Sequence, residues 1–404
     1  MPVSRAAETA EFSPSQLLPD LPLVMWMVLI AIGLGLAGGL GASELVTAFN
    51  AGFGRALGEF ALILLPSFAL AAALSQQCIT SDAAARTTLF ASPVAGAGMI
   101  CPDTAYAALS PAAGRHKLAL ALGAYSGFKL LYPAGPLIVA AGLGSAVLDG
   151  TEPAQLLAFG LLLVPPVWGV GCLWLRAALG SSPQAPSAGE SNADKRRIVI
   201  LFSPFILMAS LLTLGALLGE TGIAALDFIL LPKGALLCAA LLALAQIPRD
   251  NRRTCLDASV RRTGSLLLLI GAASAFGAVL NTVLPLGNLM PEGSGILTLL
   301  ALFVLTVGFK LAQGSSMATF AAVAPVAAPI VAASGADPLA AVFAICLGSF
   351  IAILPNDSYY WLVRGDALEA EKSELKVTGV LAGATVAQAT LGLAILLAYS
   401  ALVS

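Results

Sequence analysis

Two aspartates and two lysines stand where charged side chains are rare, inside long apolar stretches of the chain. Asp103 and Asp357 fall where proline or glycine interrupts an apolar run, and Lys129 and Lys310 lie a few residues before similar interruptions. A charge in apolar surroundings is costly unless it is paired, neutralised or bound to an ion. The aspartates could therefore carry a proton or hold a cation, and the lysines could neutralise an anion. The alternatives are a carboxylate that caps a half-helix and lysines that reach the membrane surface.

Four interrupted segments carry or adjoin these residues and offer further polar groups. They span residues 95–104, 132–136, 313–316 and 355–358. Where Gly or Pro breaks a helix, freed N–H groups face anions and freed C=O groups suit cations. Hydroxyl, amide and backbone groups of these segments therefore join the candidate site. The candidate substrate-binding residues are Thr104, Lys129, Pro133, Gly135, Lys310, Gly314, Ser315, Ser316, Asn356 and Ser358, and the candidate coupling-ion residues are Asp103 and Asp357.

The composition places these residues in a membrane protein. The chain has 404 residues, of which 58% are hydrophobic and only 10% are charged, against roughly 25% charged residues in an ordinary soluble domain. The mean hydropathy is +0.92. This composition excludes a soluble enzyme, a nucleic-acid binder and a disordered protein. The net charge of −2 also argues against the positively charged surface that nucleic-acid binding requires. Apolar runs of about 20 residues favour an all-α polytopic protein in a lipid bilayer over a β-barrel.

The sequence carries no motif for catalysis or for a cofactor. Its six cysteines form no Cys-x-x-Cys pair, and the chain contains no P-loop, Gly-x-Ser-x-Gly or His-Glu-x-x-His motif. The single His116 lies between Arg115 and Lys117, which is typical of a surface turn. We therefore expect no enzyme, no catalytic residue, no metal and no cofactor, apart from a coupling proton or Na⁺.

Charge in the connections predicts how the chain crosses the membrane. Nine apolar runs near 22–40, 57–79, 117–146, 154–178, 198–219, 230–247, 264–284, 338–363 and 377–401 are candidate spans, and two interrupted runs lie near 88–112 and 295–333. Cytoplasmic loops are rich in Lys and Arg. All the cation clusters fall inside only if each interrupted run is a re-entrant hairpin, the first from the inner face and the second from the outer face. This scheme puts the N-terminus in the cytoplasm and the C-terminus outside, with Arg55 as the main exception.

The order of these elements repeats with opposite orientation. Helix, helix, hairpin, helix, helix runs over 22–178 with the inner hairpin 88–112, and again over 230–404 with the outer hairpin 295–333. Residues 1–21 form a cytoplasmic N-terminal segment, and 179–229 hold a linker and a connecting helix. Inverted repeats with two broken helices and two opposed hairpins are typical of secondary transporters.

Several segments resemble the gluconate permease family, the gluconate:proton symporters of the ion transporter superfamily. Residues 313–319 and 356–363 resemble two motifs of that family, 263–280 resembles the helix that precedes them, and 133–136 is similar to its proline-rich break. The resemblance implies an organic acid permease that forms a homodimer, moves its substrate by an elevator motion and carries gluconate or related hydroxy acids with protons.

The prediction is a secondary active symporter of a small organic anion in the bacterial inner membrane, coupled to protons. A second possibility of the same class is a Na⁺-coupled transporter of an organic anion or an amino acid, because Asn and Asp oxygens are the ligands that hard cations prefer. A channel or an intramembrane enzyme is the alternative of another class. An enzyme should show a nucleophile–base pair, and a channel should show no alternating-access exchange.

Overall fold

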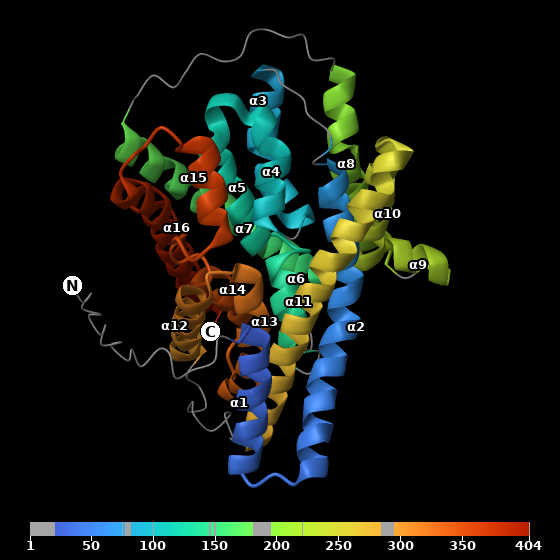
Figure 1. The fold of residues 1–404 in the computed structure, drawn as a ribbon, viewed down its shortest axis with the longest axis vertical. Coiled ribbons are helices and arrows are strands. Elements are labelled where there is room, and N and C mark those ends of the chain that lie inside the picture. The colour runs from blue at the N-terminus through green and yellow to red at the C-terminus, as the bar shows by residue number, and fades with distance from the viewer. Residues whose placement is uncertain are drawn as a thin grey trace, which may run out of the picture.

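A computed structural model describes residues 21–74, 76, 82–99, 101–144, 147–148, 151–180, 195–219, 221–283 and 295–403. All secondary structure in these residues is helical (Figure 1). The predicted segment 1–21 and the linker after residue 180 lie almost entirely outside the described residues. The elements are α1 (Leu23–Ala37), α2 (Ala42–Leu74), α3 (Asp82–Gly98), α4 (Pro102–Ala113), the 3₁₀ turn η2 (Gly114–His116), α5 (Lys117–Leu130), α6 (Gly135–Leu143), α7 (Pro153–Leu179), α8 (Lys195–Leu218), α9 (Ala224–Leu230), α10 (Pro232–Gln246), α11 (Arg249–Val283), α12 (Gly295–Gln313), α13 (Ser316–Ser334), α14 (Pro338–Gly348), α15 (Ser358–Ala367) and α16 (Glu374–Val403).

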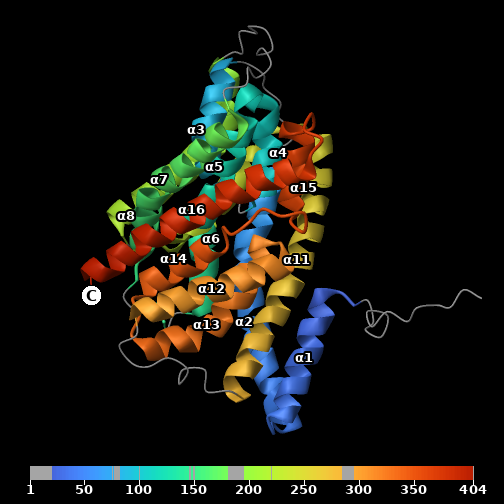
Figure 2. The same ribbon diagram turned by 90° about the vertical axis from the view of Figure 1, so that its left-hand side faces the viewer.

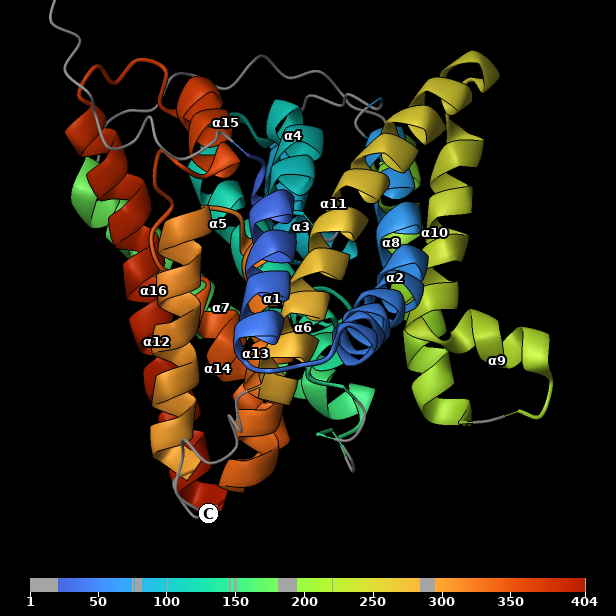
Figure 3. The same ribbon diagram turned by 60° about the horizontal axis from the view of Figure 1, so that its bottom comes forward.

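The helices pack as two groups. The long-helix group contains α1, α2 and α8 to α11, in which α2 and α11 lie along each other and α1 and α10 pack against them. The broken-helix group contains α3 to α7 and α12 to α16. Figure 2 shows α1 and α11 on the right-hand side of the molecule, and Figure 3 shows the two groups side by side, with α11 between α13 and α2. The groups meet chiefly where α11 packs on α13.

Small residues allow α2 and α11 to approach closely. A Cβ at Gly52 would lie 2.5 Å from the backbone oxygen of Ser274, and a Cβ at Gly271 would lie 2.7 Å from the Phe53 ring. Helices in lipid gain little from burying apolar surface against each other, so close backbone contact through small residues is what stabilises such a pair.

Both long helices begin well before the apolar runs that predicted them. The run at 57–79 becomes α2 from Ala42, and the run at 264–284 becomes α11 from Arg249. With 33 and 35 residues, each helix is about 50 Å long, longer than the ~30 Å hydrocarbon layer. Polar residues therefore extend each helix beyond its apolar part. Arg55, expected at the end of a helix, is an interior residue of α2.

The structure has a helix break at each of the four predicted segments. The first break lies between the end of α3 at Gly98 and the start of α4 at Pro102. Residues 131–134 separate α5 from α6, 314–315 separate α12 from α13, and 349–357 separate α14 from α15. The first and third breaks are hairpin tips, since α3 packs on α4 and α12 packs on α13. Local chain breakers explain the agreement, because Gly and Pro interrupt the helical pattern where the sequence places them.

Length alone does not distinguish a hairpin arm from a span. In the described part of the chain, six helices are long and apolar enough to cross a membrane, or seven if α9 and α10, bent by 79°, form one span. Both 19-residue arms of the second hairpin are among the six. The prediction that 295–333 is re-entrant therefore depends on the cation pattern.

The cation-bearing connections gather at one end of the molecule. Arg86 lies in the first half of α3, and Arg115 lies in η2, which directly follows α4. The first half of α3, the end of α4 and the junctions α10–α11 and α15–α16 lie at the same end of the molecule, which is uppermost in Figure 1. Junction α1–α2 and the end of α11 lie at the opposite end. This arrangement is the one that the positive-inside rule requires if the upper end is cytoplasmic.

A labelling experiment tests this topology. Single cysteines at Arg86 and Arg115 on a cysteine-free background are expected to react with a membrane-impermeant maleimide only after cells are permeabilised. Ser43, which is exposed at the start of α2 beside the α1–α2 junction at the opposite end of the molecule, is the control and should react in intact cells. Labelling of only one of positions 86 and 115 in intact cells would mean that residues 88–112 cross the membrane.

Candidate functional site

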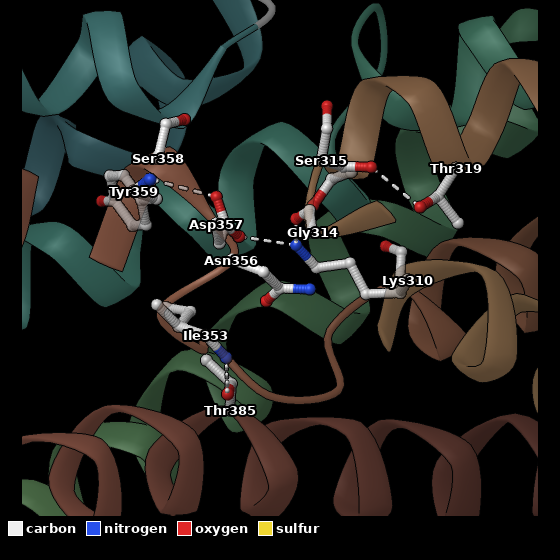
Figure 4. Close-up of polar contacts among 12 residues, drawn as sticks. Lys310, Gly314, Ser315, Thr319, Ile353, Asn356, Asp357, Ser358, Tyr359 and Thr385 are labelled. Atoms are coloured by element: carbon white, nitrogen blue, oxygen red, sulfur yellow. Dashed lines mark hydrogen bonds and ion pairs between the residues drawn. The ribbon is translucent and has the colours of Figure 1, made fainter. Parts of the chain in front are cut away.

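The tip of the second hairpin touches the break between α14 and α15 through a glycine. Gly314 has a φ of +72°, a conformation that other residues rarely adopt, and a Cβ there would lie 2.2 Å from the backbone oxygen of Asn356. The Asn356 side chain donates a hydrogen bond from Nδ2 to the Leu311 carbonyl at 2.8 Å. Gly314 and Asn356 therefore hold the tip of the second hairpin directly against the break between α14 and α15 (Figure 4).

A buried ion pair joins the same two segments. Lys310 Nζ lies 2.5 Å from Asp357 Oδ2 and also donates to the Gly314 carbonyl. Asp357 is the N-cap of α15, since its Oδ1 accepts the Tyr359 backbone N–H at 3.0 Å. The two charged residues are only 1% and 6% exposed. Asp357 is thus both paired and capping, two of the roles that the sequence left open for it.

Lys129 contacts three segments, and none of the described residues forms an ion pair with it. Its Nζ donates to Ser316 Oγ at 2.8 Å, to Ser349 Oγ at 3.0 Å and to the Ser349 carbonyl. It also lies 4.0 Å from the centre of the Tyr125 ring, where the ring face attracts a cation. The side chain is fully buried, so it does not reach the membrane surface. Lys129 links the end of α5, the start of α13 and the end of α14.

The tip of the first hairpin joins the same region through Asp103. Ser358 Oγ, in the first turn of α15, donates to Asp103 Oδ2 at 2.6 Å. No ion pair involves Asp103 among the residues that the structure describes. Further along the chain, Tyr106 of α4 and Lys117, the first residue of α5, both contact Asp366 of α15, at 2.8 Å and 2.5 Å. The hairpin is thus held against α15 at two levels.

A cavity of about 240 Å³ lies where these segments meet. It faces the start of α4, the start of α13, the start of α15 and one side of α11. Five predicted site residues line it: Asp103, Ser315, Ser316, Asp357 and Ser358. The other lining residues are Phe68, Cys101, Pro102, Tyr125, Phe128, Arg262, Ser265, Leu266 and Met317.

The remaining predicted residues hold the framework and do not line the cavity. Lys129 and Lys310 are occupied by the contacts described above, and Thr104 Oγ1 donates to the Cys101 carbonyl of its own turn at 3.1 Å. Pro133 and Gly135 are buried in the break between α5 and α6. The last two, Gly314 and Asn356, shape the contact between the second hairpin and the break. Substrate binding by these residues stays a prediction.

The cavity combines groups that suit a hydroxylated anion. The N-terminal ends of α4, α13 and α15 all contribute lining residues, and helix N-termini carry partial positive charge and free N–H groups. Ser315, Ser316 and Ser358 add hydroxyls, and Asp103 and Asp357 add carboxylate oxygens that accept hydrogen bonds. One guanidinium, that of Arg262, also lines the cavity. Arg262 is absent from the residues predicted for the site, because it follows Arg261 in a cation-rich segment that is typical of a cytoplasmic loop.

Replacing Lys129 tests its framework role. Lys129→Met leaves the acceptors of Ser316 and Ser349 without a donor, so the free energy of unfolding is expected to fall by about 1.5–3 kcal/mol. Substrate affinity of the molecules that remain folded should stay near the wild-type value. Lys117→Met, at the partly exposed start of the same helix, is the control and should lose at most about 1 kcal/mol. Normal thermal stability in detergent with weakened substrate binding would instead place Lys129 in the binding site.

Comparisons with known proteins agree with this picture. Residues 189–402 match the sequence model described as GntP family permease. The chain is 25% identical to the Gnt-II system L-idonate transporter of Escherichia coli over 84% of this chain and 86% of that one. It is 24% identical to the high-affinity gluconate transporter of the same organism, again over 84% and 86%.

A solved structure shares the fold. The YdaH transporter of Alcanivorax borkumensis, whose crystal structure is described as having an unusual topology, superposes with a TM-score of 0.63 at 19% identity. The match covers 93% of this chain and 97% of that one. The family match covers more than half of the chain, and it confirms both the resemblance found in the sequence and the expectation that the protein is not an enzyme. The chain belongs to the GntP family of permeases.

Proposed function

We propose that this permease is a secondary active transporter that moves a hydroxy acid anion such as gluconate, together with a proton, across the bacterial inner membrane. The observation that carries the proposal is the cavity onto which the N-termini of α4, α13 and α15 converge. Positive helix ends favour an anion. The L-idonate and gluconate transporters among its relatives support a sugar acid as the substrate.

The lining groups match a molecule with one carboxylate and several hydroxyls. Serine hydroxyls can donate and accept, and the carboxylates of Asp103 and Asp357 accept hydrogen bonds from sugar hydroxyls. A site that hydrogen-bonds substrate hydroxyls rejects analogues that lack them, because its own polar groups are then left unpaired. We therefore expect simple alkyl carboxylates to compete poorly with gluconate.

Charge balance supports one coupling ion for each anion. Asp103, Lys129, Lys310 and Asp357 sum to zero when all four are charged. An anion alone would bring these four groups and the substrate to a net charge of −1, and moving uncompensated charge through hydrocarbon is costly. One proton, bound at Asp103, restores neutrality. A sodium ion would balance the charge equally well, and the experiment below separates the two.

The division into two helix groups supports an elevator motion. All four breaks and most of the cavity belong to the broken-helix group, which packs chiefly through α13 against α11 of the long-helix group. A rigid shift of the broken-helix group along α11 would carry the cavity from one face of the membrane to the other. In this proposal the two inverted repeats supply the equivalent end states, the long-helix group stays fixed, and it forms the contact of a homodimer.

Uptake by the purified protein in proteoliposomes tests the proposal. Radiolabelled gluconate should accumulate when an inward proton gradient is imposed, should not respond to a Na⁺ gradient alone, and should undergo counterflow without any gradient. Accumulation that requires Na⁺ would favour the sodium-coupled alternative, with amino acids included among the competitors. Flux without counterflow would indicate a channel.

A further inference from the structure

Arg262 differs from the other charged groups of the cavity in the helix that carries it. It lies on α11 of the long-helix group, whereas Asp103 and Asp357 belong to the broken-helix group. Of the lining serines, Ser265 shares α11 with Arg262, and those at 315, 316 and 358 belong to the hairpin tip and the start of α15. Its side chain is exposed, with the guanidinium 4.9 Å from the Phe68 ring centre. Its Nη2 donates to Cys101 Sγ at 3.3 Å. A thiol sulfur is a weak acceptor, so this contact leaves the guanidinium available to a stronger one.

No lysine of the site competes with Arg262 for an incoming carboxylate. Lys310 is engaged by Asp357 and by the Gly314 carbonyl, and Lys129 is engaged by two serines. Neither lines the cavity, and Arg262 is the one cation among its described lining residues. A guanidinium binds a carboxylate through two parallel hydrogen bonds, which makes it the best carboxylate partner among the side chains.

The other end of the interface offers no such partner. A second cavity of about 400 Å³ lies between α2 and α11 on one side and α6 and α13 on the other. It is lined by small and apolar residues such as Ala51, Gly277 and Pro325, and by Ser274 and Thr282, and no charged residue is among its described lining residues. The two faces of the interface between the helix groups therefore differ in charge.

We propose that Arg262 binds the carboxylate of the substrate at one membrane face only, in the arrangement seen here. This inference depends on the proposed function. Because Arg262 stays with the long-helix group, a shift of the broken-helix group along α11 removes the substrate from it. The face at which Arg262 acts is the cation-rich face, which the positive-inside rule assigns to the cytoplasm. Arg262 thus gives that face the higher affinity for the anion.

Exchange kinetics measured separately at each face test the proposal. The concentration of gluconate that half-saturates exchange is determined in inside-out and right-side-out membrane vesicles for the wild type, Arg262→Gln, Arg262→Lys and Arg261→Gln. The Gln variant at 262 should raise this concentration at the cation-rich face by about 10- to 100-fold, the usual effect of one charged hydrogen-bonded partner. At the opposite face it should change less than about twofold, within ordinary scatter. Arg262→Lys should fall between, since it keeps the charge without the paired geometry.

Arg261→Gln is the matched control, because Arg261 is an exposed neighbour on the same helix that does not line the cavity. This variant should leave the half-saturating gluconate concentration unchanged at both faces. Equal losses at both faces, or no loss at either, would overturn the proposal for Arg262 and leave the transport function intact. Wild-type vesicles that exchange neither gluconate nor L-idonate would instead remove the proposed function, and this inference with it.

Discussion

Replacing Asp103 with asparagine is expected to abolish accumulation driven by a pH gradient while exchange of substrate across the membrane continues. The amide imitates a permanently protonated carboxyl. With it, the charges at positions 103, 129, 310 and 357 and that of the bound anion sum to zero, so the loaded broken-helix group can cross. Without the anion they sum to +1, so the empty group cannot return. Exchange needs only loaded crossings, whereas net uptake needs the empty return as well.

The surroundings of Asp103 make it the better proton carrier of the two candidate aspartates. It lines the cavity and is partly exposed, so a proton can reach it together with the substrate. Its described contact is the hydrogen bond from Ser358 at 2.6 Å, and no lysine neutralises it at contact distance. Asp357 is instead paired with Lys310 at 2.5 Å. A carboxylate that already has a counter-ion gains little from a proton.

The measurement compares two assays on one preparation. An imposed gradient of about one pH unit can sustain about tenfold accumulation by the wild type, and Asp103→Asn should fall to the level found without a gradient. Counterflow in the absence of a gradient should remain within a few-fold of the wild type. Thr104→Ala is a matched control in the same helical turn, because Thr104 donates only to the Cys101 carbonyl of its own turn; it should keep both activities. Full gradient-driven accumulation by Asp103→Asn would exclude this residue as the proton carrier.

The sequence predicts the breaks and the spans well because their signals are local. Gly314 and the Pro-Asn-Asp-Ser segment at 355–358 interrupt apolar runs, and such interruptions need no tertiary partner to end a helix. The beginnings of α2 and α11 are missed for the opposite reason. Residues 42–56 and 249–262 are too polar to count as apolar runs, and it is the packing of the two helices on each other that extends them.

The site is predicted as a set of residues rather than as a set of contacts. Lys310 and Asp357 both stand out as charges in apolar runs, but they are 47 positions apart. Their pairing depends on how the second hairpin meets the break between α14 and α15, which no local pattern specifies. The place of Arg262 also depends on contacts between segments that are distant in the sequence. Its neighbours in sequence are the cations of a surface cluster, and only the approach of α11 to the two hairpin tips gives it a place in the cavity.

The second large effect is expected at the Lys310–Asp357 pair. Removing one partner leaves the other as an uncompensated charge at 1% or 6% exposure, which costs about 3–5 kcal/mol for a buried pair. Lys310→Met and Asp357→Asn should therefore each lower the unfolding temperature in detergent sharply and abolish transport. The double variant should regain most of the lost stability, because it buries two neutral side chains in place of two charges.

This double-mutant cycle also decides between the two roles of Asp357. If the aspartate were the proton carrier, Asp357→Asn alone would stay folded, keep counterflow and lose only gradient-driven accumulation. If the pair holds the second hairpin tip against the start of α15, the single variants fail in both assays and the double variant recovers folding, with a coupling free energy of at least about 2 kcal/mol. Lys376→Met, which breaks a pair with Glu371 at 54% and 27% side-chain exposure, is the matched control and should cost at most about 1 kcal/mol. Single variants as stable as this control would show that the buried pair does not hold the site together.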